Sequence, residues 1–201
     1  MIPISWAQDK TKVNIVAAAN LDVVLNEIKV EFVKENPGVE VNIILGSSGK
    51  LTSQIINGAD IDVFMAADMN FPRQIESKGY ALTKTTYYAG GKLILFSKNN
   101  LDLSKGLSVL LDSKVEHIAI ANPKLAPYGK AAMQTIENAK LKNIDSKIVY
   151  SENINQAAEY TLVAAEAGFI AKSLLFTPKM KDPVRKKLWA GWKWAVNQVL
   201  N

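Results

Sequence analysis

Short apolar runs alternate along the first half of the chain with segments whose apolar residues recur at helical spacing. The runs predict strands at 13–17, 39–45 and 61–66, and the spaced segments predict helices at 21–35, 51–58 and 69–78. The first of these helices carries an apolar stripe, and Asn36-Pro37-Gly38 ends it; the stripe consists of Leu21, Val24, Leu25, Ile28 and Phe32. Strands that alternate with helices in this way predict a mainly parallel sheet flanked by helices.

The same alternation restarts after Gly90 and Gly91. Strands are predicted at 92–96, 118–121, 148–150 and 168–171, and helices at 129–140 and 153–164. Two cycles of this kind predict two α/β lobes that join near 83–91. We expect the first lobe to span 8–84 and the second to span 85–176.

Length and composition fit this architecture and exclude several kinds of protein. The chain has 201 residues, of which 48% are hydrophobic and 21% charged, and it has no run of about 20 apolar residues that would span a membrane. It has no cysteine, so neither disulfides nor thiolate metal sites are expected. The net charge is +5, but the lysines are mostly scattered singly, which favours a solvated surface over a nucleic-acid interface. A mild positive field also steers anions towards the protein.

The N-terminus resembles the end of a secretory signal peptide. Ser5 and Ala7 satisfy the small-x-small rule and precede a polar stretch at 8–12, which predicts cleavage after Ala7. An ordinary frayed terminus is the alternative. The first interpretation predicts an exported protein from which most of the signal peptide has been removed.

Four junctions share one design, an apolar strand followed by small or polar residues and then a helix N-terminus; they lie at 17–21, 45–50, 121–129 and 150–154. Ligands of open α/β sheets bind at the carboxyl ends of the strands. Helix N-termini present unpaired N–H groups and a partial positive charge, which suits anions. Asn20, Ser48 and Asn153 are each also consistent with simple helix caps. Four junctions, two from each lobe, together favour an anion site.

Nucleotide and catalytic motifs are missing. Gly49-Lys50 is followed by Leu51 and position 44 is isoleucine, so the Walker A pattern fails, and no G-x-G-x-x-G occurs. The single imidazole, His117, has no partner at motif spacing, and the loop at 46–49 is not a nucleophile elbow. These residues therefore predict a binding protein and not an enzyme.

At these junctions the sequence resembles the periplasmic molybdate-binding proteins of bacterial ABC transporters. The resemblance covers about 13–180, and its matching stretches are 17–21, 32–38, 46–49 with Gln54 and Ile55, 59–68, 121–123, 127–129, 151–154 with Gln156 and Ala157, and 166–170. It implies the two-lobed type II periplasmic-binding-protein fold, with the ligand in the interlobe cleft. It also implies an oxyanion held by neutral donors, namely the side chains of Asn20, Ser47, Ser48 and Tyr128 and the backbone N–H of Ile154.

The chain departs from the family pattern at Tyr128, in a slightly shortened stretch before Gly168, and in its C-terminal segment. Tyr128 stands where one branch of the family has alanine, and that branch has its ligand tyrosine at the position of Ala171, so Tyr128 is expected to supply the phenol from another direction. The family returns to the first lobe after the second, which assigns 177–201 here to an incomplete return segment. Beyond Lys181 this segment does not match, although Asp182 and Pro183 make a credible helix start.

The resemblance implies that the protein captures molybdate or tungstate outside the cytoplasm and delivers it to the membrane permease of an ABC importer. We expect a periplasmic monomer with no cofactor, no nucleic-acid partner and no metal coordinated by side chains, since the metal arrives as the oxyanion. Three alternatives remain: a protein for another oxyanion such as sulfate, an enzyme of the same fold acting on a phosphorylated small molecule, and a cytoplasmic anion sensor.

Overall fold

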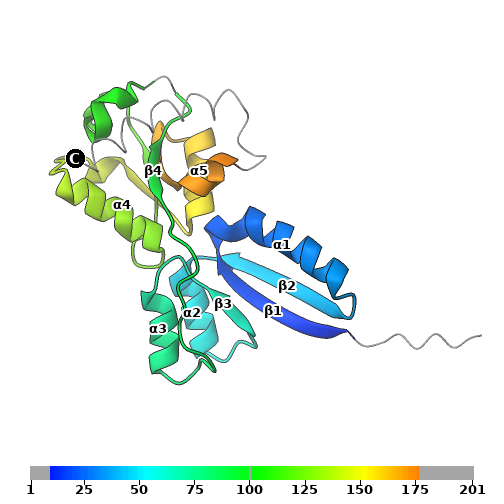
Figure 1. The fold of residues 1–201 in the computed structure, drawn as a ribbon. Coiled ribbons are helices and arrows are strands. Elements are labelled where there is room, and N and C mark those ends of the chain that lie inside the picture. The colour runs from blue at the N-terminus through cyan, green and yellow to red at the C-terminus, as the bar shows by residue number, and fades with distance from the viewer. Residues whose placement is uncertain (1–9, 100, 177–201) are drawn as a thin grey trace, which may run out of the picture.

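The computed structural model describes residues 10–99 and 101–176, which form two α/β lobes (Figure 1). The first lobe contains β1 (Thr11–Ala18), β2 (Val39–Gly46) and β3 (Val63–Met65), with helices α1 (Asp22–Glu35), α2 (Ser48–Ile56) and α3 (Asn70–Ser77). Its sheet has the order β2-β1-β3, and both pairs of neighbours are parallel. Helix α1 packs on β2, while α2 packs on β1 and on α3.

The second lobe contains β4 (Leu93–Phe96), β5 (Ile118–Ala121), β6 (Ile148–Ser151) and β7 (Ala167–Ala171), with helices α4 (Pro127–Asn138) and α5 (Ile154–Val163). Short 3-10 helices lie at Ala19–Leu21, Leu103–Leu111, Asp145–Lys147 and Lys172–Phe176. The sheet order is β4-β7-β5-β6. Strand β4 runs antiparallel to β7 because the chain enters this sheet from the interlobe segment, whereas β5 is parallel to both of its neighbours.

Strand register brings the predicted junctions to one edge of each sheet. Ala18 pairs with Gly46 at the carboxyl ends of β1 and β2, and Ala121 pairs with Ser151 at the ends of β5 and β6. Since parallel strands end at the same edge, the four strand-to-helix turns face the space between the lobes. In Figure 1 this edge of the first lobe faces the second lobe.

The second lobe has the better-filled core. Strand β5 is buried along its whole length, and the largest fully buried side chains include Phe96 and Phe169. Helix α5 lies so close to β7 that a Cβ at Gly168 would overlap the Thr161 hydroxyl. The second lobe thus carries its half of the cleft on a closely packed core.

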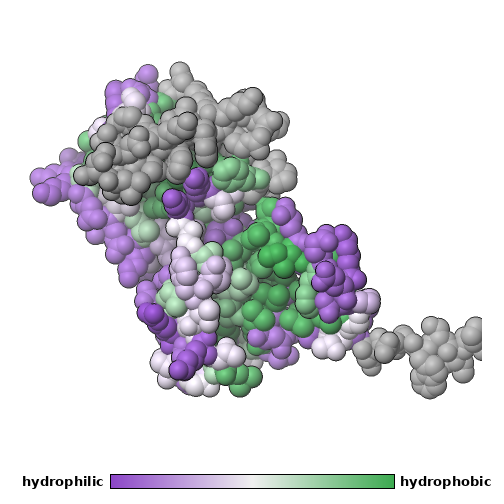
Figure 2. All heavy atoms as spheres, viewed as in Figure 1, coloured by the Kyte–Doolittle hydropathy of each residue, from purple (hydrophilic) through white to green (hydrophobic). Residues whose placement is uncertain are grey.

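The first lobe leaves part of its apolar surface exposed. Of the predicted stripe on α1, Leu25 is buried, but Val24, Ile28 and Phe32 are exposed, as is Ile44 on β2. Figure 2 shows apolar surface gathered beside α1 and over the first sheet. Most of this stripe is therefore not covered by other described residues.

Most predicted elements are present, with differences at their ends. The predicted strand at 61–66 contracts to Val63–Met65, and the helix predicted from Gly129 begins at Pro127, because proline fits the first helical turn, where its missing N–H costs nothing. The predicted cleavage point after Ala7 and the predicted return segment at 177–201 lie outside the described residues. Within the described ranges, no helix combines the length and apolar character needed to cross a membrane.

Candidate functional site

A small cavity lies where the two lobes meet at the carboxyl edges of their sheets. Its volume is about 10 Å³, and its lining comes from the turns after β1, β2, β3, β5 and β6. All five residues predicted to bind the ligand line it: Asn20, Ser47, Ser48, Tyr128 and Ile154. None of its lining residues is charged. The structure thus brings residues separated by more than a hundred positions into one neutral pocket.

Ser47 and Asn20 each bring a buried polar atom to this cavity with no partner among the described residues. These atoms are Ser47 Oγ and Asn20 Oδ1. Ser47 is only 3% exposed and holds the N-cap position of α2, yet its side chain makes no capping bond. A buried polar atom without a partner costs about 1–3 kcal/mol, so such atoms are uncommon in native structures. The two atoms fit a site that pairs with a ligand.

The Asn20 amide can present either of its ends to that ligand. Its Oδ1 is an acceptor, whereas its NH₂ group is a donor. The two ends have the same shape, and amide orientation follows from the hydrogen-bonding partners present. Opposite an anion, the NH₂ group faces the ligand.

Ser48 is oriented by the strand beside it. Its Oγ accepts a hydrogen bond from the backbone N–H of Ala67 at 3.0 Å, just beyond β3. Accepting this bond leaves the hydroxyl proton available for another acceptor. Ser48 is the first residue of α2 and does not cap this helix. The bond from Ala67 holds its hydroxyl at the cavity, where the hydroxyl proton is free to be donated.

Ile154 contributes its backbone N–H at the start of α5. The N-cap of this helix is Asn153, whose Oδ1 accepts from the amides of Asn155 and Gln156 at 3.0 and 3.1 Å. This confirms the capping interpretation for Asn153. The cap leaves the first amide of the helix, that of Ile154, without an intrahelical partner. Together with the helix dipole, this amide suits a negatively charged ligand.

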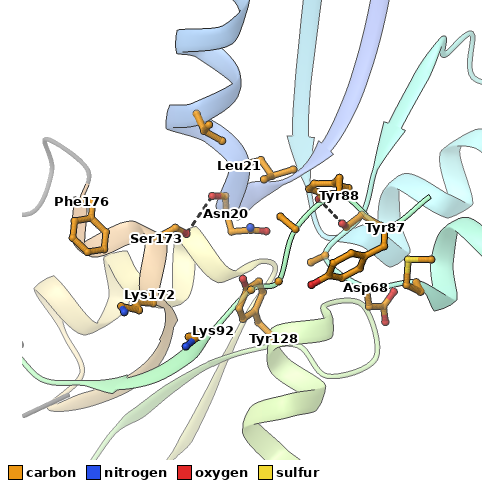
Figure 3. Close-up of a pocket in the computed structure, with 17 residues that line it drawn as sticks. Asn20, Leu21, Asp68, Tyr87, Tyr88, Lys92, Tyr128, Lys172, Ser173 and Phe176 are labelled. Carbon is orange, nitrogen blue, oxygen red and sulfur yellow. Dashed lines mark hydrogen bonds between the residues drawn. The ribbon is translucent and has the colours of Figure 1, made fainter. Parts of the chain in front are cut away.

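Tyr128 supplies a phenol from the second position of α4. The side chain is buried, at 8% exposed, and Figure 3 shows its hydroxyl directed towards Asn20. Burial raises the pKa of Tyr128 above its ordinary value of 10.0. The phenol therefore stays neutral at physiological pH and keeps its proton to donate. Ala171, the position at which one branch of the family has its ligand tyrosine, belongs to the same buried cluster as Tyr128. A tyrosine at either position would therefore lie in the same region of the protein.

Two contacts hold the lobes together at the rim of the cavity. The Gly49 amide, in the first turn of α2, donates to the carbonyl oxygen of Leu125 in the opposite lobe at 2.8 Å. Beside it, Lys50 Nζ lies 2.5 Å from a carboxylate oxygen of Glu152. Neither contact followed from the sequence, because no local pattern marks a bond between segments so far apart. The lobes are in contact at this point, and the cavity there has room for about one water molecule. A larger ligand requires its lining to move outward.

A larger pocket of about 560 Å³ adjoins the cavity and shares Asn20, Ala67 and Tyr128 with it. Its lining also includes the interlobe segment from Tyr87 to Lys92 and the 3-10 helix Lys172–Phe176 (Figure 3). Tyr88 donates from its hydroxyl to the carbonyl oxygen of Ala66 at 2.7 Å, which ties the interlobe segment to the end of β3.

The single imidazole of the chain lies away from the cavity. His117 precedes β5 and is 54% exposed on its side chain, with Nδ1 3.5 Å from a Glu166 oxygen. Among residues 10–99 and 101–176, no cluster of three or more histidine, cysteine or acidic side chains is placed to hold a metal ion. The cavity lining contains no imidazole or carboxylate that would act as a general acid or base.

Comparisons with known proteins agree with this geometry. The family model of bacterial extracellular solute-binding proteins matches residues 13–186. The molybdate-binding protein ModA of Azotobacter vinelandii is 35% identical over 196 residues, which cover 96% of this chain and 75% of that protein. ModA of Rhodobacter capsulatus is 36% identical over 160 residues, 78% of this chain and 62% of that protein. The chain thus spans between about three fifths and three quarters of these relatives.

The solved structure of the Azotobacter vinelandii periplasmic molybdate-binding protein superposes with a TM-score of 0.76 at 35% identity, covering 84% of this chain and 75% of that one. The two-lobed fold expected from the sequence resemblance is thereby confirmed. The chain belongs to the bacterial extracellular solute-binding proteins, in the branch that includes the molybdate-binding protein ModA.

Proposed function

We propose that this protein captures molybdate or tungstate between its two lobes and delivers it to the permease of an ABC importer. The observation that carries the proposal is the neutral cavity, in which the buried Ser47 Oγ and Asn20 Oδ1 lack protein partners among the described residues, at the N-terminal ends of helices. Its relatives are named for molybdate binding, and their similarity extends over most of this chain.

A lining of neutral donors suits a fully deprotonated dianion. Hydroxyl and N–H groups donate to all four oxygens of such an ion, and the helix ends add partial positive charge. Phosphate at neutral pH carries a proton of its own, which would face another donor and stay unpaired. Leaving a buried donor unpaired costs about 1–3 kcal/mol, which favours molybdate over phosphate by about fivefold to more than a hundredfold.

Sulfate passes this protonation test, because it too is fully deprotonated. Discrimination against sulfate therefore rests on how far the donors stand from the centre of the bound anion. Tungstate is nearly the same size as molybdate and presents the same four oxygens. We accordingly propose one site for both metal oxyanions, with no side chain bonded to the metal itself and no further cofactor.

The proposal includes the setting in which the protein works. We propose an exported, periplasmic protein that works as a monomer. The small-x-small pattern at Ser5 and Ala7 supports export with cleavage after Ala7. The lack of acid–base groups in the cavity lining favours binding over catalysis. Lobes at 8–84 and 85–176 agree with the extended segment before β4. The predicted return at 177–201 would add to the first lobe.

Titration calorimetry on the full chain tests the proposal directly. Molybdate, tungstate, sulfate and phosphate are titrated separately, and each weaker anion is then used in competition with molybdate. Molybdate and tungstate should bind tightly and with similar affinity, and sulfate and phosphate far more weakly. If phosphate competed on equal terms with molybdate, the donor argument would be wrong, and a preference for sulfate would assign the site to that anion.

A further inference from the structure

Gly91 lies directly against the hydroxyl of Tyr128, although the two residues are 37 positions apart and come from different segments. A Cβ at Gly91 would overlap Tyr128 Oη and would lie 3.0 Å from Cζ. Gly91 does not lie in the left-handed φ region, where the glycines are Gly58, Gly79 and Gly106. Position 91 therefore needs glycine because there is no space for a side chain, and not because of its backbone conformation.

Both sides of this contact are held in place. The residue after Gly91, Lys92, accepts at its carbonyl from the Lys172 amide at 2.8 Å, so the interlobe segment cannot easily shift. On the other side, a Cβ at Gly129 would overlap the carbonyl oxygen of Ala121, so α4 starts in direct contact with the β5 backbone. Since these contacts hold both backbones, we expect an atom added at Gly91 to displace the ring of Tyr128.

We propose that Gly91 is a positioning residue for the anion-binding phenol: its bare Cα is the surface on which the Tyr128 hydroxyl rests. The inference builds on the proposed oxyanion site. The hydroxyl lines the cavity together with Asn20, Ser47, Ser48 and Ile154, and its direction decides whether it donates to a bound anion. Because Gly91 belongs to the segment that connects the lobes, the same contact ties the phenol to the hinge side of the protein.

The neighbouring glycine offers a matched control. A Cβ at Gly90 would lie 2.8 Å from the hydroxyl of Tyr87, so Gly90 is also packed against a phenol. However, Tyr87 is 66% exposed, and its ring can swing into solvent to admit a methyl group. Gly90→Ala and Gly91→Ala thus introduce the same atom one residue apart, and only the second meets a buried tyrosine.

Calorimetry with molybdate on Gly91→Ala, Gly90→Ala, Tyr128→Phe and the double variant Gly91→Ala/Tyr128→Phe forms the first test. Gly91→Ala should lower molybdate affinity by about tenfold or more, as expected for a lost hydrogen bond to a charged group. Gly90→Ala should stay within about twofold of the wild type. In the Tyr128→Phe background Gly91→Ala should add little to the loss of affinity, since the hydroxyl, which the added Cβ meets most closely, is already gone. Equal losses in both backgrounds would overturn the proposal, as would wild-type affinity for Gly91→Ala.

A second measurement needs no ligand and separates this inference from the proposed function. Protein labelled with ¹³C at the tyrosine ζ carbon gives one NMR signal for each tyrosine, and Tyr128→Phe identifies the signal of Tyr128. Gly91→Ala should shift that signal and lower the pH at which Tyr128 ionises, because the displaced phenol gains solvent, whereas Gly90→Ala should do neither. If the wild type failed to bind molybdate, the proposed function would be wrong, but the shift of the Tyr128 signal would still test the role of Gly91. An unchanged Tyr128 signal in Gly91→Ala would overturn the proposal that Gly91 positions Tyr128.

Discussion

Replacing Ser47 with alanine separates a ligand-binding hydroxyl from a structural one, because the two roles predict changes of opposite sign. The Ser47 hydroxyl is buried and has no partner among the described residues. An unpaired buried hydroxyl costs about 1–3 kcal/mol, and Ser47→Ala removes that group while keeping most of the packing. The ligand-free variant should therefore be as stable as the wild type, or more stable by up to about 3 kcal/mol.

The complex should respond in the other direction. When the Ser47 hydroxyl donates to a dianion, its loss removes a charge-assisted hydrogen bond worth about 1.5–3 kcal/mol, so affinity should fall by about tenfold to a hundredfold. Ligand at 100 times the dissociation constant stabilises the wild type by about 2.7 kcal/mol, and at the same concentration a tenfold weaker variant gains only about 1.4 kcal/mol. Urea unfolding with and without molybdate measures both quantities on one sample.

Ser53→Ala is the control, since Ser53 lies on the same helix, is exposed, and donates to the carbonyl oxygen of Gly49. It should leave molybdate affinity unchanged. The reasoning is refuted if Ser47→Ala weakens the ligand-free protein by more than about 1 kcal/mol, since that would reveal a structural hydrogen bond. Unchanged molybdate affinity would equally remove Ser47 from the site.

Three further variants follow from the same geometry. Ser48→Ala should lower molybdate affinity by about tenfold to a hundredfold and also destabilise the ligand-free protein by about 1 kcal/mol, because the Ala67 amide loses its acceptor; calorimetry and urea unfolding measure the two effects. Tyr128→Phe should lower affinity with little change in the melting temperature of the ligand-free protein. In the wild type, the contribution of the Tyr128 phenol should be constant below pH 10 and disappear as the pH rises through its raised pKa, as titrations across this range would show. Lys50→Ala removes an exposed ion pair with Glu152 across the cleft, so affinity should fall by no more than about fivefold at low salt and not at all in about 1 M NaCl.

On the proposed function, each lobe has a separate part in binding. The first lobe offers Asn20, Ser47 and Ser48, and the second offers Tyr128 and the Ile154 amide. An anion bound to one lobe alone would meet only part of this set. If this set binds the anion as proposed, the ligand stabilises the arrangement in which the two lobes meet.

Much of the fold and the place of the site followed from local patterns in the sequence. Apolar runs and helical spacing are properties of neighbouring residues, so they predicted nearly every strand and helix, and the alternation of the two predicted parallel sheets. Parallel strands end at one edge for geometric reasons, so the turns containing Asn20, Ser47 and Tyr128 were expected to converge. The differences arose at element ends and at β4, whose antiparallel direction depends on where the interlobe segment enters the sheet.

Only the tertiary structure decided which polar group caps a helix and which faces the cavity. From the sequence, Asn20, Ser48 and Asn153 were equally good caps, yet Asn153 alone of these three caps its helix, while Ser48 is held by Ala67 and Asn20 Oδ1 has no partner among the described residues. The same holds for the contact of Gly91 with Tyr128. Hydrogen-bond partners and close approaches depend on three-dimensional distances between segments far apart in the chain, and no periodicity or propensity along the chain encodes them.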